Sequence, residues 1–260
     1  MQNGVNNTKF NMVILKLPEE IEKMRASNHI VAEILGILKG MVRPGITTGE
    51  LDSYSEELVL KKGAQPAFKG YMGYPYSLCI SVNSEVVHGL PSDRVLLAGD
   101  IVSLDFGAYY KGYYGDAAVT VPVGDVSDQA ARLIRVTEQG LYEGIREAKA
   151  GNRLGDISAA VQKCVESAGF SVVRDFVGHG IGKKLHEEPQ IPNFGVSGRG
   201  IELKTGMVLA IEPMVNEGSY RVKVTDNGWT VVTEDGMLSA HFEHSVAITK
   251  DGPYILSVLQ

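Results

Sequence analysis

Two aspartates interrupt apolar runs in the stretch GDIVSLDFGAYYKGYYGDAAVTV, residues 99–121. The stretch is predicted to form a β-hairpin, because residues 109–112 break the strand pattern near its middle. Residues that face each other across this hairpin then have numbers that sum to about 221. Asp105 and Asp116 satisfy that sum, so we expect them to lie directly opposite each other on one face. Two opposed carboxylates repel each other unless a shared proton or a bound cation neutralises them.

Three further segments carry a ligand-type residue in an apolar or glycine-rich setting. Glu212 lies in VLAIEPMV, Glu243 in HFEHSVAI, and His179 between two glycines in VGHGIG. A lone pair of aspartates is more simply explained as two strand ends in solvent. Four carboxylates and one imidazole in such settings instead indicate an oxygen-rich site for two divalent cations. Hard oxygen donors favour iron, manganese or cobalt, and zinc is also compatible with them.

The composition limits the class of protein. The chain has 260 residues, of which 44% are apolar, and a mean hydropathy of -0.02, which suits one sizeable domain or two small ones. No apolar run approaches the ~18 residues of a membrane span, and the start, MQNGVNNTKFNM, lacks a signal-peptide pattern. We therefore expect a cytoplasmic protein without a membrane role. A net charge of -6 offers no electrostatic footprint for nucleic acid.

The cysteines give no sign of a thiolate metal site. Cys79 and Cys164 form neither a CxxC pair nor a zinc-type spacing. Two unpaired cysteines suit a reducing compartment. Any metal site in this chain is therefore expected to use carboxylates and histidines.

The elements that must position these residues can be predicted from periodicity and caps. Helices are expected over residues 18–39, from Thr47 to Gly63, and over residues 127–149. Thr47 and Glu50 form a capping box, and Ser127 is suited to cap the third helix. Strands are expected over 78–87, 100–106, 116–122, 207–215 and 242–249. Helices and strands in alternating blocks indicate an α+β fold.

An internal repeat relates the two halves of the chain. Three glycines that frame a predicted helix recur 106 residues later, as Gly45, Gly49 and Gly63 and then Gly151, Gly155 and Gly169. The heptad GDIVSLD at 99–105 also parallels GMVLAIE at 206–212. Glycine-bounded helices are common enough for coincidence, but the better interpretation is a pseudo-two-fold fold. Asp105 and Glu212 would then lie at equivalent places near the axis of one domain, 1–260, with half-domains of roughly 18–124 and 125–250.

The order and local context of several segments resemble the type I methionine aminopeptidases, which share the pita-bread fold with prolidase-like enzymes. The likeness extends over essentially the whole chain from about residue 18. The segments that carry it are YMGYPYSLCISVNSEVVHGLP, LDFGAYYKGYYGDAA, GHGIGKKLHEEPQIPNFG, AIEPMV and DGMLSAHFEHSVAIT.

This resemblance implies a dinuclear metal centre and its ligands. Asp116 and Glu243 would bridge two ions, Asp105 would bind one of them, and His179 and Glu212 would bind the other. Two adjacent cations lower the pKa of a shared water and act as Lewis acids toward a peptide carbonyl. Glu212 would also act as the general base.

The resemblance also implies roles for residues beyond the ligands. His186 would donate to the scissile carbonyl oxygen, and His88 would contact the amide that follows the cleaved bond. No such role falls on His29, His241 or His244. The substrate methionine would lie against Tyr71, Tyr74, Cys79, Trp229 and Leu185, although an aromatic residue is common in some relatives where this chain has Leu185. Taken alone, the two histidines and the aromatic residues would be explained as packing residues.

The expected function is removal of the initiator methionine from nascent chains whose second residue is small. The expected partners are nascent N-termini, with a transient ribosome contact, and the protein is expected to be a monomer. One alternative is an X-Pro aminopeptidase or dipeptidase of the same fold, although such enzymes usually carry an extra N-terminal domain and more histidines. Another is a non-catalytic pita-bread binding module, although such modules lose metal ligands and gain basic segments.

Overall fold

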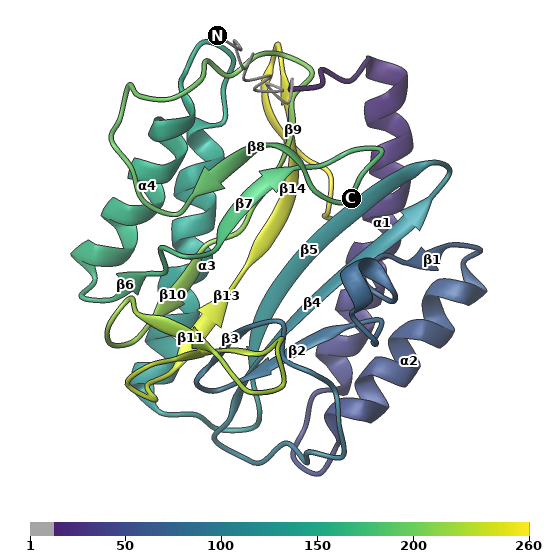
Figure 1. The fold of residues 1–260 in the computed structure, drawn as a ribbon, viewed down its shortest axis with the longest axis vertical. Coiled ribbons are helices and arrows are strands. Elements are labelled where there is room, and N and C mark those ends of the chain that lie inside the picture. The colour runs from purple at the N-terminus through teal and green to yellow at the C-terminus, as the bar shows by residue number, and fades with distance from the viewer. Residues whose placement is uncertain (1–12, 260) are drawn as a thin grey trace, which may run out of the picture.

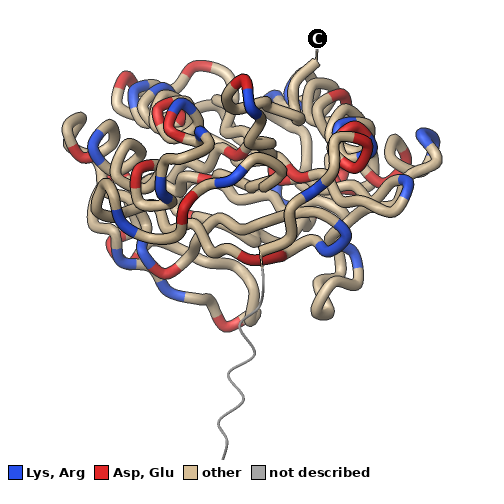
Figure 2. Tube along the Cα trace, turned by 90° about the horizontal axis from the view of Figure 1, so that it is seen from above, with Lys and Arg blue, Asp and Glu red and all other residues tan. Residues whose placement is uncertain are grey.

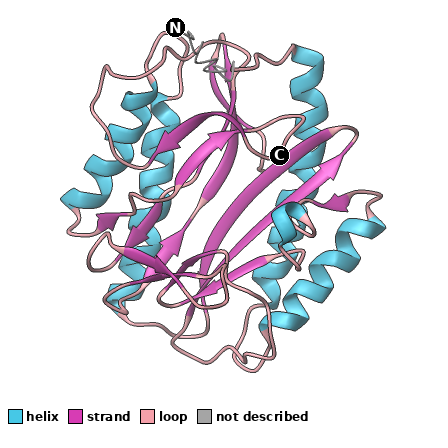
Figure 3. Cartoon of the chain, viewed as in Figure 1, coloured by secondary structure: helices cyan, strands magenta, loops and turns pink. Residues whose placement is uncertain are grey.

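A computed structural model describes residues 13–259 and shows a curled central sheet flanked by two pairs of helices (Figure 1). Helices α1 (Pro18–Met41) and α2 (Thr48–Lys61) lie to one side of the sheet, and α3 (Asp128–Glu147) and α4 (Leu154–Ser167) to the other. Figure 3 shows the same arrangement, with strands at the centre of the molecule and helices on its two flanks. The sequence predicts that the N-terminus, residues 1–12, is not a signal peptide. These residues lie outside the described part of the chain.

The predicted helices and their caps are confirmed. The Thr47 Oγ1 accepts a hydrogen bond from the Glu50 amide at 3.1 Å, and the Thr47 amide donates to the Glu50 carboxylate at 2.7 Å. Ser127 accepts from the Ala130 amide at 3.1 Å. These bonds satisfy amide groups that have no partner within the first helical turn. None of the described helices combines the length and apolar character that crossing a membrane requires.

The central sheet has nine strands in the order β1-β4-β5-β14-β9-β7-β8, with β2 paired to β4 and β15 paired to β14. Its strands are β1 (Gln65–Pro66), β2 (Cys79–Val82), β4 (Ile101–Tyr110), β5 (Tyr113–Pro122), β7 (Val177–Gly180), β8 (Glu187–Pro192), β9 (Val208–Ile211), β14 (Glu243–Thr249) and β15 (Gly252–Ile255). Two three-stranded sheets, β13-β10-β6 and β11-β12-β3, complete the fold. They comprise β3 (Glu85–Val87), β6 (Ser171–Val172), β10 (Met214–Asn216), β11 (Val222–Val224), β12 (Val231–Thr233) and β13 (Ser239–His241).

Two of the predicted strands are each divided in the structure. The segment predicted as one strand over 78–87 forms β2 and β3, because Asn83 turns the chain with a φ of 60°. The segment predicted over 207–215 likewise divides into β9 and β10. The α+β fold class itself is confirmed.

The register of the β4–β5 hairpin corrects one expectation. The strands continue to a two-residue turn at Lys111 and Gly112, with φ values of 49° and 86°, which is the left-handed turn that favours a hairpin. Asp105 therefore pairs with Ala118, and Asp116 pairs with Gly107, so the two aspartates are not directly opposed. A shift of two residues preserves the face on which each side chain lies. The aspartates are diagonal neighbours on one face, as a two-residue slip requires.

A glycine makes room for this arrangement. Gly107 stands opposite Asp116, and a Cβ there would lie 2.8 Å from both the Ala67 Cβ and the Phe68 ring, and 3.3 Å from the Asp116 carboxylate. A side chain at this position would therefore press on the aspartate and on the wall behind it.

Matching local structures recur at the spacing of the sequence repeat. Helices α2 and α4 each have 14 residues and begin 106 positions apart. The Gly45 amide donates to the Leu96 carbonyl at 2.9 Å, and the Gly151 amide donates to the Leu203 carbonyl at the same distance. These parallels support the proposed half-domains of roughly 18–124 and 125–250, which remain a proposal.

The close approach at the start of α4 leads to a stability prediction. A Cβ at Gly155 would lie 2.3 Å from the Val196 carbonyl oxygen and 2.8 Å from that of Arg199, both of them backbone atoms. Gly155→Ala should therefore lower the free energy of unfolding by about 1–3 kcal/mol in urea denaturation. The matched control is Gly36→Ala within α1, where no atom lies within 4 Å, and it should raise that free energy by about 0.5–1 kcal/mol. Equal effects of the two substitutions would contradict the prediction.

Candidate metal centre

All of the residues that the sequence predicts for the site line one cavity of about 150 Å³. They are Tyr71, Tyr74, Cys79, His88, Asp105, Asp116, His179, Leu185, His186, Glu212, Trp229 and Glu243. Phe68 and Met72, which the sequence reasoning does not identify, also line it. The predicted ligands and the predicted substrate contacts thus share a single space.

Five adjacent strands of the central sheet each bring one predicted ligand to this cavity. Asp105 lies in β4, Asp116 in β5, Glu243 in β14 and His179 in β7, and Glu212 directly follows β9. These strands stand side by side in the order β4-β5-β14-β9-β7. Neighbouring residues of β4, among them Leu104 and Phe106, pack with the α1 side chains in an apolar core. Because successive side chains of a strand alternate between faces, Asp105 points away from the helices.

The carboxylates form a buried cluster whose oxygens lack partners. One ligand atom each of Asp116, His179 and Glu243 lies within 4.8 Å of the others. The Asp105 Oδ1, Asp116 Oδ1 and Glu243 Oε1 are buried and accept no hydrogen bond from the described residues. Buried oxygens of this kind are costly unless something binds them. Their number, burial and hard donor character fit divalent cations.

The electrostatics of the cluster follow from burial. Burial raises the pKa of Asp105 to about 7 and that of Glu212 to about 8. Burial, and then the neighbouring carboxylates, raise the pKa of both Asp116 and Glu243 well above the usual range. The protein without cations therefore favours protonated carboxyl groups, and cations would replace those protons.

His179 is held as a neutral imidazole with one nitrogen available. Burial, and then the charge of His186, lower the pKa of His179 to about 3. The His179 Nδ1 lies 2.9 Å from the Gly180 carbonyl oxygen, which can only accept a hydrogen bond. The Nδ1 therefore carries the proton, and the Nε2, 3.5 Å from the Glu212 carboxylate, presents its lone pair to the site.

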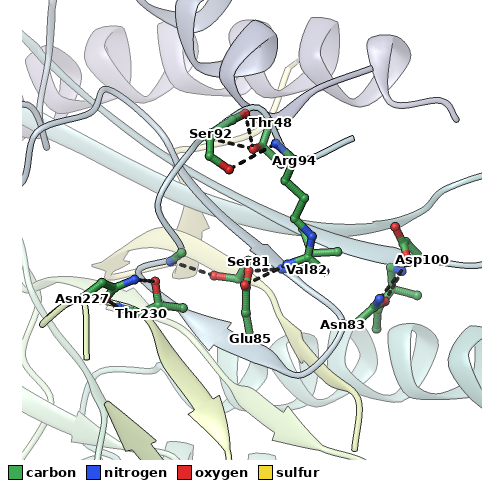
Figure 4. Close-up of polar contacts among 12 residues, drawn as sticks. Thr48, Ser81, Val82, Asn83, Glu85, Ser92, Arg94, Asp100, Asn227 and Thr230 are labelled. Atoms are coloured by element: carbon green, nitrogen blue, oxygen red, sulfur yellow. Dashed lines mark hydrogen bonds and ion pairs between the residues drawn. The ribbon is translucent and has the colours of Figure 1, made fainter. Parts of the chain in front are cut away.

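His88 directly follows β3, and the packing of its backbone against β2 fixes its position. Its φ of 59° is a left-handed conformation, and at Gly89, which follows it, a Cβ would lie only 2.0 Å from the Ile80 carbonyl oxygen. Figure 4 shows polar contacts of the preceding turn between β2 and β3, including the Glu85 carboxylate that accepts from the Val82 amide at 2.8 Å. Burial lowers the pKa of His88 to about 4, so its imidazole is neutral at pH 7.

His186 and Tyr71 stand together on the other side of the cavity. The Tyr71 hydroxyl lies 2.8 Å from the His186 Nδ1, and the rings of His186 and His179 are 4.2 Å apart between centroids. His186 is an exposed residue, and its ring lies against the rings of Tyr71 and His179.

The remaining wall is apolar and aromatic. The Tyr74 hydroxyl donates to backbone carbonyls at 3.0 and 3.1 Å, and the Tyr74 ring stacks edge-on against Trp229 at 5.1 Å between centroids. Cys79 and Leu185 are buried in the same apolar cluster. Burial raises the pKa of the Cys79 thiol, so the thiol is neutral at pH 7. The wall suits an apolar, polarisable side chain.

The structure places His241 beside the site, although sequence reasoning assigns it no role. The His241 Nε2 is buried, 3.6 Å from the Glu212 carboxylate. Its position two residues before Glu243 gave no reliable signal, because His241 ends β13 and Glu243 begins β14, which belong to different sheets. Phe68 offered no signal either, because it lies in a loop whose path is set by contacts far along the chain.

The fold and the site together define a metallopeptidase of the pita-bread class. The model of metallopeptidase family M24 matches residues 22–250, and the chain belongs to that family. The chain is 57% identical to a methionine aminopeptidase of Clostridium perfringens, over 96% of this chain and all of the relative, and 54% identical to methionine aminopeptidase 1 of Bacillus subtilis, over 95% and 99%. It superposes on the methionine aminopeptidase of Thermotoga maritima with a TM-score of 0.94 at 51% identity, covering 95% of this chain and all of the other.

Proline-specific peptidases share the fold at lower similarity. The chain superposes on an Xaa-Pro dipeptidase of Bacillus anthracis with a TM-score of 0.77 at 24% identity, covering 95% of this chain and 62% of the other. At that identity the likeness concerns the fold alone. The predicted pita-bread fold and the resemblance to methionine aminopeptidases are both confirmed.

The raised carboxyl pKa values predict how the metal-free protein responds to pH. A carboxyl whose pKa is raised by folding stabilises the folded state below its ordinary pKa, and this contribution is lost as pH rises through the raised value. Between pH 7 and 9 the melting temperature of the chelator-treated protein should fall, as Asp105 and Glu212 ionise in the buried cavity.

Two controls accompany this measurement. Glu212→Gln should make the fall less steep, because it removes a group that ionises near pH 8. The histidines have an ordinary pKa of 6.5 and are neutral in both states over this range, so they do not mask the effect. A melting temperature that rises between pH 7 and 9 would contradict the assignment of raised pKa values.

Proposed function

We propose that this chain is a metal-dependent aminopeptidase that removes an N-terminal methionine from polypeptides whose second residue is small. The observation that carries the proposal is the set of five ligand-type side chains brought to one cavity by five adjacent strands. The near full-length similarity to methionine aminopeptidases supports it.

The proposed ligands of the metal centre are Asp105, Asp116, His179, Glu212 and Glu243. The resemblance to methionine aminopeptidases implies that Asp116 and Glu243 would be shared by two ions, and both are buried with an oxygen that has no partner among the described residues. When bound, two divalent cations supply Lewis-acid polarisation of the peptide carbonyl and acidify the attacking water. Four carboxylates with a single imidazole favour iron, manganese or cobalt, with zinc also compatible.

The chain's own residues then move the protons. Glu212 is proposed as the general base, as the resemblance to methionine aminopeptidases implies, because its carboxyl lines the cavity and would be ionised once cations neutralise the cluster. His186 donates a hydrogen bond to the carbonyl oxygen as charge develops there. His88, neutral and fixed on its left-handed backbone, contacts the amide after the cleaved bond.

The apolar wall accounts for the choice of methionine. Tyr74, Cys79, Leu185 and Trp229 enclose space for an unbranched thioether, and Tyr71 lies at its edge. Leu185 replaces an aromatic wall with an aliphatic one and keeps the pocket apolar. His88 lines the same cavity and is proposed to limit the space for the second residue, which favours small side chains there.

The cellular setting is also part of the proposal. The partners are nascent polypeptide N-termini, met in the cytoplasm, with a transient contact to the ribosome and the protein acting as a monomer. In Figure 2 basic and acidic residues are interspersed along the chain, in keeping with a protein that handles varied peptides.

Removal and return of metal tests the centre. Chelation should abolish peptidase activity, and addition of manganese or cobalt should restore it. Asp116→Ala should lower kcat/KM more than tenfold and lower the metal content, whereas Asp125→Asn, which alters an exposed aspartate, should change neither. An Asp116→Ala protein within tenfold of the parent would contradict the dinuclear site.

The substrate is tested with Met-X-Met peptides. The kcat/KM should be about 100-fold higher when X is alanine, glycine or serine than when X is lysine, glutamate or leucine, because an ångström of misplacement costs about that much rate. An N-acetylated Met-Ala-Met peptide should not be cleaved. Equal values for Met-Ala-Met and Met-Lys-Met, or preference for X-Pro peptides without methionine, would favour a proline-specific peptidase instead. A metal-loaded protein without peptidase activity would favour the non-catalytic binding module.

A further inference from the structure

A buried ion pair joins the segment before α1 to the loop that carries His186. The Lys16 Nζ donates to the Glu187 Oε2 at 2.7 Å and to the Ile14 carbonyl at 3.0 Å. Both charged side chains are only 4% exposed. Glu187 directly follows His186, so the pair acts on the backbone next to the imidazole.

The segment that carries Lys16 is itself fixed to the body of the protein. The Lys16 amide donates to the Gly206 carbonyl at 2.7 Å. Gly206 has a φ of 94°, and a Cβ there would lie 2.8 Å from the Lys16 carbonyl oxygen. This close backbone contact makes Lys16 a fixed point rather than a freely moving surface lysine.

The loop is folded tightly around the ion pair. The second oxygen of Glu187 accepts a hydrogen bond from the Lys184 amide at 3.1 Å. A Cβ at Gly182 would lie 2.7 Å from both the Glu187 Oε1 and the Lys16 Cε. The carboxylate thus joins residues 182–187 to Lys16 at a place where no larger side chain fits.

This pair is different from the other ion pairs of lysine and arginine within residues 13–259. In each of those, both side chains are at least 19% exposed. Removing two charges from water costs about as much free energy as their attraction provides, so a buried ion pair adds little net stability. Separating the partners would leave a buried charge unpaired, which is costly. The Lys16–Glu187 pair is therefore expected to fix the position of the loop more than to stabilise the fold.

We infer that Lys16 and Glu187 are positioning residues that hold His186 against the scissile carbonyl. His186 needs such a restraint because it is an exposed residue whose side chain has one hydrogen-bond contact within the described residues, with Tyr71, besides its ring contacts with Tyr71 and His179. This inference rests on the proposed function. The segment before α1 thereby becomes part of the machinery that places a group on the substrate.

The test compares two pair variants with a matched control. One pair variant is Lys16→Met, and the other is the double substitution Lys16→Met/Glu187→Gln, called the doubly neutral variant because neither side chain then carries a charge. The control is Lys183→Met, which removes an equal charge from the same loop at a side chain that is 68% exposed. Both pair variants should lower kcat on Met-Ala-Met by about 10- to 100-fold with KM within about threefold, since loss of alignment acts on rate. The control should stay within about twofold of the parent. The doubly neutral variant leaves no unpaired buried charge, so it should fold and bind metal like the parent.

Two further measurements separate positioning from a merely structural role. His186→Ala should itself lower kcat, and in that background the Lys16→Met/Glu187→Gln change should cost less than about twofold, because the group being positioned is gone. The His186 ring signal in a carbon–proton NMR spectrum, assigned by its absence from His186→Ala, should shift or broaden in the doubly neutral variant. The same signal should be unchanged in Lys183→Met.

The outcomes are distinguishable. Additive losses in the His186→Ala background, a lower melting temperature with unchanged kcat for each metal-loaded molecule, or an unmoved His186 signal in the doubly neutral variant would each overturn the inference. A parent protein that releases no methionine would overturn the proposed function instead. The NMR comparison still decides in that case whether the pair holds His186.

Discussion

The structure depends on the mutual repulsion of carboxylates buried in one cavity. Asp105, Asp116, Glu212 and Glu243 cannot all ionise there without a compensating charge, and burial raises the pKa of each. A fold that brings these carboxylates together is less stable unless protons or cations neutralise their charges. Divalent cations bound at this cluster would satisfy its unpartnered oxygens and neutralise its negative charge.

The central sheet and the helices packed against it fix the positions of these carboxylates. Five neighbouring strands position one proposed ligand each, and the hydrogen-bonded ladder fixes their spacing. The opposite face of β4 packs against α1, so burial of apolar side chains there offsets the cost of burying the carboxylates. In the proposed repeat, Asp105 within β4 and Glu212 directly after β9 hold matching places.

The residues around the cluster are kept neutral by the same low-dielectric surroundings. Burial lowers the pKa of His88 to about 4 and that of His179 to about 3, so these rings offer lone pairs and N–H groups without adding charge. Cys79 likewise stays a neutral thiol beside the carboxylates. One burial effect therefore raises the proton affinity of the acids and lowers that of the imidazoles.

The helices, their caps and the α+β class could be predicted from the sequence, as could a set of residues that the structure gathers at one cavity, because periodicity, capping pairs and carboxylates in apolar runs are local signals. The sequence also indicated the repeat, through glycines at a constant offset. The tertiary structure decided the hairpin register, where a turn at Lys111 and Gly112 replaced direct opposition of Asp105 and Asp116 with a diagonal contact. It also decided that His241 lies against Glu212, 29 positions away, and that Lys16 reaches Glu187, 171 positions away, since contacts at such separations are set by packing and leave no local pattern in the sequence.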